Sequence, residues 1–108
     1  MIEQLPVTAL RDWLADSTRP MPLIIDVRES WEHAVCQLPD ARLLPMQQVP
    51  AHSEELPRDR DLVLVCHHGM RSMHVADYLE SLGFTRLFNL TGGIAAWAEE
   101  VDPAMAQY

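Results

Sequence analysis

Short runs of hydrophobic residues alternate along this chain with segments in which hydrophobic residues recur every three or four positions. The continuous runs predict buried strands over 23–27, 41–45, 62–66 and 85–90. The spaced segments predict helices that begin near residues 8, 29, 72 and 94. Strands and helices that alternate in this way are typical of an α/β fold with a central, mainly parallel sheet and helices on both faces.

Individual residues refine this pattern. Thr8 is expected to cap the first helix, and Leu82 is expected on the buried face of the helix that Gly83 ends. Between residues 46 and 61 we expect only short helical pieces at the surface. The three tryptophans are expected in or near the core: Trp13, Trp31 and Trp97.

Length and composition favour one compact domain over residues 1–108, because 48% of the residues are hydrophobic and 22% are charged. The formal net charge of −8 argues against nucleic acid or an anionic membrane surface as a partner. No apolar stretch approaches the ~20 residues of a membrane span, and the first residues do not resemble a secretion signal. We therefore expect a soluble, cytoplasmic protein with reduced cysteines.

One cysteine lies between a predicted strand and a predicted helix, a position in which ligand-binding and catalytic residues are expected. Cys66 ends the strongest predicted strand, and the loop that follows, His67 to Arg71, leads into a helix. In open α/β sheets ligands bind beyond the carboxyl ends of the strands. Gly69 permits an unusual backbone angle, so that several amides and the helix N-terminus can surround an anion and favour the thiolate.

A structural interpretation of the same cysteine is also open, since free cysteines are among the most buried residues and a glycine often separates a strand from a helix. Two histidines and an arginine in one tight loop are poor core residues, however. The loop composition therefore favours a reactive thiol at Cys66.

Three segments resemble the rhodanese family, and the resemblance extends over nearly the whole chain. DVRESWEHAVCQLPDA (26–41) is similar to the family's D-V-R-E-x-x-E-[YF]-x-x-G-H-I-P-G-A stretch, CHHGMRS to its active-site loop, and NLTGGIAAW (89–97) to its closing segment. In the first segment Cys36, Gln37 and Asp40 replace the family's glycine, histidine and glycine.

The resemblance implies a single-domain sulfurtransferase in which Cys66 carries a sulfane sulfur as a persulfide. The expected donor is thiosulfate or a similar small anion, and the expected acceptor is cyanide, a thiol or a protein sulfur acceptor, with no metal or organic cofactor. Four residues separate Cys66 from Arg71, as in sulfurtransferases, whereas the related dual-specificity phosphatases and arsenate reductases have five. The substrate-binding loop is expected to comprise His67, His68, Gly69, Met70 and Arg71.

Other residues near this loop have open roles. Arg71 is expected to attract the anionic donor and brace the loop, while the side chains of His67 and His68 either tune the pocket or face solvent. Asp26, Arg28 and Glu32 resemble the family's supporting residues, and the alternative is a surface ion pair of little energetic weight.

Two further interpretations concern cysteine and metal chemistry. Cys36 is either a small apolar filler in a turn or a resolving thiol for an oxidised Cys66. Zinc is not expected at Cys66, because adjacent histidines rarely converge on one ion and no partner set completes four ligands.

The sequence leaves three functions open: a thiosulfate sulfurtransferase, a sulfur-relay domain that takes persulfide sulfur from a partner protein, and a non-catalytic rhodanese-like binding domain. The intact cysteine and loop favour the first.

Overall fold

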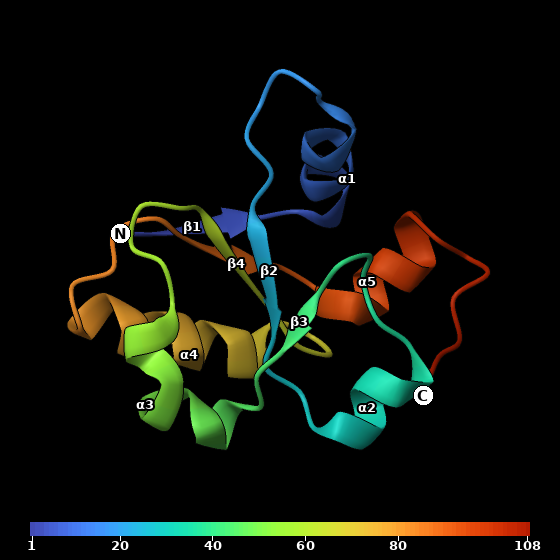
Figure 1. Ribbon diagram of the computed structural model, residues 1–108. Helices are drawn as coiled ribbons and strands as arrows, with labels where there is room; N and C mark the ends of the chain where they lie inside the picture. The colour runs from blue at the N-terminus through green and yellow to red at the C-terminus, as the bar shows by residue number, and fades with distance from the viewer.

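A computed structural model describes all 108 residues as an α/β fold around one sheet (Figure 1). The helices and strands are β1 (Ile2–Leu5), α1 (Val7–Ala15), β2 (Leu23–Asp26), α2 (Ser30–Val35), β3 (Arg42–Leu43), α3 (Val49–His52), β4 (Leu62–Val65), α4 (Met70–Ser81), β5 (Leu87–Leu90) and α5 (Gly93–Glu100), with short 3₁₀ turns at Met46–Gln48 and Ser53–Glu55. All five strands are parallel, in the order β1-β5-β4-β2-β3. The α/β fold predicted from the sequence is confirmed.

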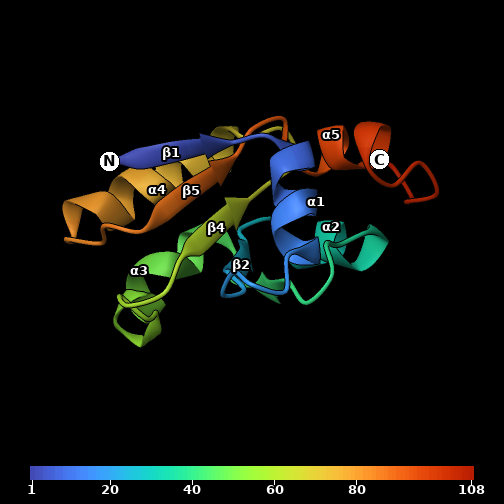
Figure 2. The ribbon, with the colours of Figure 1, turned by 90° about the horizontal axis from the view of Figure 1, so that it is seen from above.

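Two hydrophobic cores lie on opposite faces of the sheet. In Figure 1, α1 lies above the strands and α3 and α4 lie below them, and in the view from above α4 accordingly lies behind β1 and β5 (Figure 2). Successive side chains of a strand point to opposite faces. In the central strand β4, Val63 and Val65 therefore pack with α1 and α5, while Leu62 and Leu64 pack with α3 and α4. Cys66 continues this alternation into the second core.

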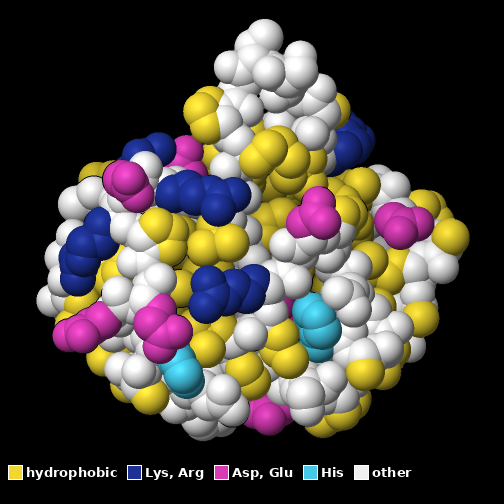
Figure 3. All heavy atoms as spheres, viewed as in Figure 1, with side chains coloured by type: hydrophobic (Ala, Val, Ile, Leu, Met, Phe, Trp, Pro, Cys, Tyr) yellow, Lys and Arg dark blue, Asp and Glu magenta, His cyan; other side chains and the backbone are white.

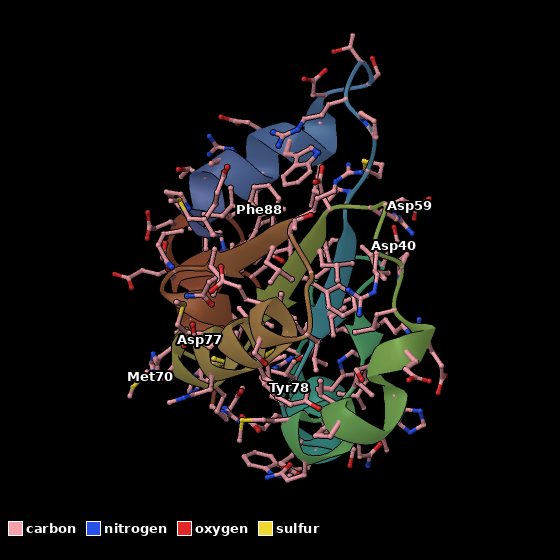
Figure 4. The ribbon with its side chains drawn as sticks, turned by 90° about the vertical axis from the view of Figure 1, so that its left-hand side faces the viewer. Asp40, Asp59, Met70, Asp77, Tyr78 and Phe88 are labelled. Atoms are coloured by element: carbon pink, nitrogen blue, oxygen red, sulfur yellow. The ribbon has the colours of Figure 1, made fainter.

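The aromatic residues under α1 show how the first core is closed. Trp13 meets Phe88 edge to face, with ring centroids 5.1 Å apart, and Phe88 projects from the sheet toward α1 (Figure 4). Trp97 is also buried, but Trp31 is 60% exposed on α2, so the expectation for that tryptophan was wrong.

The structure corrects three local predictions. Strand β1, which the sequence pattern did not reveal, is short, carries two exposed polar residues and pairs only with β5. Helix α1 begins after Pro6, so Thr8 lies inside the helix and is not its cap. Leu82 follows the last residue of α4 and is exposed, whereas Gly83 (φ +94°) does end the helix as expected.

The turn between α2 and β3 accommodates its unusual residues. Cys36 has an extended backbone, with φ −161°, which any residue can adopt. Asp40 has φ +58°, a left-handed conformation in which aspartate and asparagine are the best tolerated residues after glycine. The turn therefore needs glycine neither at Cys36, which is extended, nor at Asp40, which adopts the left-handed conformation itself.

The surface visible in Figure 3 carries basic and acidic side chains interspersed with hydrophobic ones, and no large area of one charge. None of the helices is long and apolar enough to cross a membrane.

Candidate active site

Cys66 is the first residue after the central strand β4, at the carboxyl end of the sheet. The residue is only 1% exposed, and its Sγ accepts a hydrogen bond of 3.0 Å from the backbone N–H of Gly69. The hydroxyl of Ser72 lies 3.4 Å from the same sulfur. The buried thiol is therefore in contact with polar groups, unlike a cysteine that merely fills a core.

Gly69 shapes the segment that follows the cysteine. Its φ of +101° lies in the region that side-chain-bearing residues rarely adopt, and an added Cβ would stand 3.3 Å from the Leu90 carbonyl oxygen. Helix α4 begins directly afterwards, at Met70. The predicted five-residue loop is thus three loop residues followed by the first turn of α4, a correction to the expected start of the helix.

The N-terminus of α5 holds this loop from one side. The amides of Ile94 and Ala95 donate to the carbonyl oxygens of Cys66 (2.9 Å) and His67 (3.0 Å). Gly93 allows this close approach, because an added Cβ would lie 2.5 Å from the His67 carbonyl oxygen and closer still to that of Cys66. The closing glycine segment of the sequence therefore fits against the cysteine loop.

The anchored carbonyls determine where the amides point. In a trans peptide the C=O and the next N–H point in opposite directions. The N–H groups of His67 and His68 are therefore directed away from α5, and that of Met70 is directed away from Asn89, whose Nδ2 donates to the Gly69 carbonyl (3.3 Å). Neither these three amides nor that of Arg71 donates to an acceptor within the protein. These free donors at a helix N-terminus can hold an anion.

Arg71 is held by Glu32 of α2. Its guanidinium donates two hydrogen bonds to that carboxylate, of 2.6 and 2.9 Å, and Glu32 Oε1 also accepts from the Glu29 amide at the start of α2. The hydrogen bonds from Arg71, opposed by burial, lower the pKa of Glu32 to about 2. These hydrogen bonds link α4 to α2. Because the ionised Glu32 carboxylate offsets the charge of the Arg71 guanidinium, Arg71 is not a free cation.

Asp26 and Arg28 form a buried ion pair, not a surface pair. The Arg28 side chain is fully buried, donates to Asp26 at 2.9 and 2.6 Å, and also donates to the Cys36 carbonyl at 2.6 Å. His33 lies 2.8 Å from the same Asp26 carboxylate. Although burial opposes ionisation, the hydrogen bonds from Arg28 and His33 keep the pKa of Asp26 below its ordinary value.

Tyr108 connects these two ion pairs, and no sequence motif predicted this role. Its hydroxyl accepts from Arg28 Nη1 (3.0 Å) and donates to Glu32 Oε2 (2.7 Å). Burial raises the pKa of Tyr108 to about 12, and the Glu32 hydrogen bond acts in the same direction. The Tyr108 ring stacks on His67, with centroids 4.2 Å apart, so Tyr108 also contacts the loop that follows Cys66.

The two loop histidines differ in environment. His67 is half-buried between Tyr108 and His68, whose ring stacks on it at 4.1 Å, whereas His68 is exposed. Burial and the neighbouring His68 lower the pKa of His67, which favours the neutral form of its ring. Met70 is exposed and projects outward from the start of α4 (Figure 4).

A buried polar network lies on the inner side of the thiol. The Ser72 hydroxyl donates to Asn89 Oδ1 at 2.6 Å, and Asn89 Nδ2 donates to Gln4 Oε1 at 3.0 Å. The sequence places Ser72 on the buried face of its helix, six residues after Cys66. This burial near the cysteine is the one signal from which the contact was predictable.

Cys36 and Cys66 are both free thiols, and Cys36 packs in the first core with its Sγ 3.8 Å from Arg28 Nη1. No group of three or more histidine, cysteine, aspartate or glutamate residues in the chain is arranged to hold a metal ion.

Comparisons with known proteins agree with this architecture. A family model described as "Rhodanese-like domain" matches residues 7–100. A protein named "Sulfurtransferase" from Allochromatium vinosum is 39% identical over 106 residues, which cover 98% of this chain and 97% of that protein. A crystal structure of a rhodanese-like domain protein from Staphylococcus aureus is 32% identical, covers 92% of this chain and 94% of that one, and superimposes with a TM-score of 0.83.

The same domain also occurs within longer proteins. A probable adenylyltransferase/sulfurtransferase, MoeZ, from Mycobacterium tuberculosis is 39% identical over 92% of this chain, which spans only 25% of that protein's length. The fold and the cysteine site thus define an α/β domain of the sulfur-transfer class. The chain belongs to the rhodanese-like domain family, as its sequence motifs predicted.

Proposed function

We propose that this protein, as a single rhodanese domain over residues 1–108, moves a sulfane sulfur from a small anionic donor such as thiosulfate to cyanide or a thiol through a persulfide on Cys66. One observation carries the proposal: the Gly69 N–H donates to Cys66 Sγ at 3.0 Å, within a loop whose other amides have no acceptor in the protein. Such donors stabilise negative charge on sulfur in both halves of the reaction.

In the first half-reaction the Cys66 thiolate attacks the outer sulfur of thiosulfate. A bond forms between the Cys66 sulfur and the transferred sulfur, the S–S bond of thiosulfate breaks, and sulfite leaves with the electron pair. The free amides of His67, His68, Met70 and Arg71 are suited to hold the donor's oxygens and the outer sulfur of the persulfide.

In the second half-reaction the acceptor attacks the outer sulfur of the persulfide. With cyanide, a carbon–sulfur bond forms, the S–S bond breaks, thiocyanate leaves, and the electron pair returns to Cys66 as a thiolate. Because Cys66 is 1% exposed, the site favours small reactants over a bulky one at the sulfur itself. Nothing in these steps requires a metal or an organic cofactor.

The supporting residues hold the loop and the first turn of α4 in position and do not contact the reacting sulfur. Arg71 braces the first turn of α4 through Glu32, and Tyr108 ties Glu32 to the buried Arg28–Asp26 pair. The anionic donor is therefore attracted mainly by the amides and the helix N-terminus, with Arg71 contributing a charge that Glu32 partly offsets.

Thiocyanate formation from thiosulfate and cyanide tests the proposal. We expect turnover by the natural protein, loss of at least about a thousandfold in Cys66→Ala because the nucleophile is gone, and retention of most activity in Cys36→Ser. Cys36→Ser is the matched control, since it replaces the other free thiol with a group that still accepts from Arg28. Equal activity in Cys66→Ala would overturn the proposal.

Sulfite release in the absence of an acceptor distinguishes the proposed thiosulfate sulfurtransferase from the sulfur-relay alternative. A thiosulfate sulfurtransferase releases one equivalent of sulfite as Cys66 is loaded. A relay domain releases none from thiosulfate but gains one sulfur atom on Cys66 from a persulfide donor.

A further inference from the structure

The Ser72 hydroxyl has two possible partners and one hydrogen. It lies 2.6 Å from Asn89 Oδ1 and 3.4 Å from Cys66 Sγ, and all three residues are buried. A serine hydroxyl donates one hydrogen bond but accepts others. It can therefore donate to the amide oxygen or to the sulfur, but not fully to both.

Asn89 is fixed with its oxygen toward Ser72. Its amide nitrogen faces two acceptors, Gln4 Oε1 at 3.0 Å and the Gly69 carbonyl oxygen at 3.3 Å. An inverted amide would place its oxygen against these two oxygens. Since the oxygen faces Ser72 and only accepts, the hydroxyl donates to Asn89, and the lone pairs of Ser72 face the sulfur.

We propose that Ser72 is a further catalytic residue whose hydroxyl changes its acceptor from Asn89 to Cys66 when the sulfur becomes anionic, and that Asn89 is the positioning residue that holds the hydroxyl between turnovers. In the resting state the Cys66 S–H donates to Ser72 Oγ. On ionisation the S–H bond breaks and its proton passes to water or buffer. The Ser72 O–H bond stays intact and turns toward the thiolate.

The consequence for sulfur transfer rests on the proposed function. When the acceptor takes the outer sulfur, the electron pair of the breaking S–S bond returns to Cys66. The Ser72 hydroxyl and the Gly69 amide then stabilise this charge from two sides. Asn89 opposes the change, because its buried oxygen loses a donor when the hydroxyl turns away.

Alkylation of Cys66 by iodoacetamide tests the switch without requiring sulfur transfer. The rate is followed across pH by peptide mass spectrometry, which separates Cys66 from Cys36. We expect Ser72→Ala to slow alkylation at neutral pH by about three- to tenfold, because the thiolate loses a donor. Asn89→Leu is expected to speed it by a similar factor, because the hydroxyl is released to the sulfur. Ser81→Ala, at the far end of the same helix, is the matched control and should change nothing.

The double variant Ser72→Ala/Asn89→Leu decides whether Asn89 acts through Ser72. The switch predicts that the Asn89 substitution has no further effect once the hydroxyl is gone. An effect of the same size with and without Ser72 would overturn the proposal, as would an unchanged alkylation profile in Ser72→Ala.

The infrared S–H stretching band gives a second measurement that does not depend on the Asn89 variant folding. In Cys36→Ser protein the remaining band belongs to Cys66, and a hydrogen bond to Ser72 lowers its frequency. We expect the band to move to higher frequency in Ser72→Ala and to stay in place in Ser81→Ala. An unmoved band in Ser72→Ala would refute the resting hydrogen bond. Failure of the proposed function itself would appear separately, as absence of thiocyanate formation in the unaltered protein.

Discussion

Arg71 and Glu32, which are 39 residues apart in the chain, are joined by two hydrogen bonds of 2.6 and 2.9 Å. The pair connects the first turn of α4, beside the thiol, to helix α2. Because the Glu32 carboxylate is buried and Arg71 is its partner, neither charge is independent of the other. From this relationship we infer that Arg71 acts mainly as a brace between α4 and α2.

Glu32→Gln should therefore weaken both the fold and the reaction. In this variant Arg71 loses its charged partner, because a neutral amide replaces the carboxylate. We therefore expect the free energy of unfolding at pH 7 to fall by about 1–3 kcal/mol. Urea unfolding measures this change, and the thiocyanate assay should show a fall in kcat/KM of about tenfold or more. Stability within about 0.5 kcal/mol of the natural protein would contradict the assigned role.

The same variant has a distinctive pH dependence. The pKa of Glu32 is lowered to about 2, from an ordinary value of 4.5. A lowered carboxylate pKa stabilises the fold fully above the unfolded value, and this stabilisation is lost as the pH falls from about 4.5 toward 2. The difference in unfolding free energy between the natural protein and Glu32→Gln should therefore shrink across that range. A constant difference would show that the charge of Glu32 is not involved.

Gly93→Ala is expected to displace the cysteine loop. Its Cβ would overlap the carbonyl oxygens of Cys66 and His67, which are backbone atoms that α5 holds in place. We expect a loss of about 2–4 kcal/mol in unfolding free energy and a fall in activity of more than about tenfold.

Gly83→Ala is the control for backbone strain. Gly83 has φ +94°, farther than Gly93 (φ +58°) from the left-handed optimum, but its added Cβ would meet only the flexible end of Arg58. This variant should lose about 1–2 kcal/mol of stability and keep its activity. If both variants lose activity equally once folded, the fit of α5 against the loop is not the cause.

Tyr108→Phe should separate the hydroxyl of this tyrosine from its ring. The phenyl ring can still stack on His67, but Arg28 loses an acceptor and Glu32 loses a donor. We expect a stability loss of about 1–2 kcal/mol and an increase in KM for thiosulfate of a few-fold. Tyr108→Ala removes the ring as well and should have the larger effect. Identical effects of the two variants would place the whole contribution in the hydroxyl and none in the ring.

The pKa of His67 is lowered by burial and by His68, and the neutral form of its ring is therefore favoured. His67→Gln should therefore retain activity within about threefold at pH 7.5, with the exposed His74→Gln of α4 as the control. A loss of a hundredfold or more would give the imidazole a direct role that its neutral state does not suggest.

Much of this arrangement was predictable because it depends on local sequence. The hydrophobic run over 62–66 and the glycine that follows determine a strand, a sharp turn and a helix, and parallel strands bring their carboxyl ends together. The positive φ of Gly69 confirms the conformation expected there. Strand β1 was not predicted, because its edge position leaves Glu3 and Gln4 exposed and its sequence therefore contains no hydrophobic run.

The contacts that complete the site are long-range, and no local pattern encodes them. The bond between Arg71 and Glu32, and that between Tyr108 and Arg28, depend on how separate elements pack. Thr8 was misplaced as a cap because the helix already begins at Val7, with Pro6 as the extended residue directly before it. Trp31 was misplaced because α2 is too short to bury a full hydrophobic face.

Sulfur loading of Cys66 is read from the intact mass of the protein after incubation with thiosulfate and removal of excess reagent, without reductant. We expect a gain of one sulfur atom, located on the Cys66 peptide, that cyanide removes and that Cys66→Ser does not show. No gain in mass from either thiosulfate or a persulfide donor, or the same gain in Cys66→Ser, would contradict it.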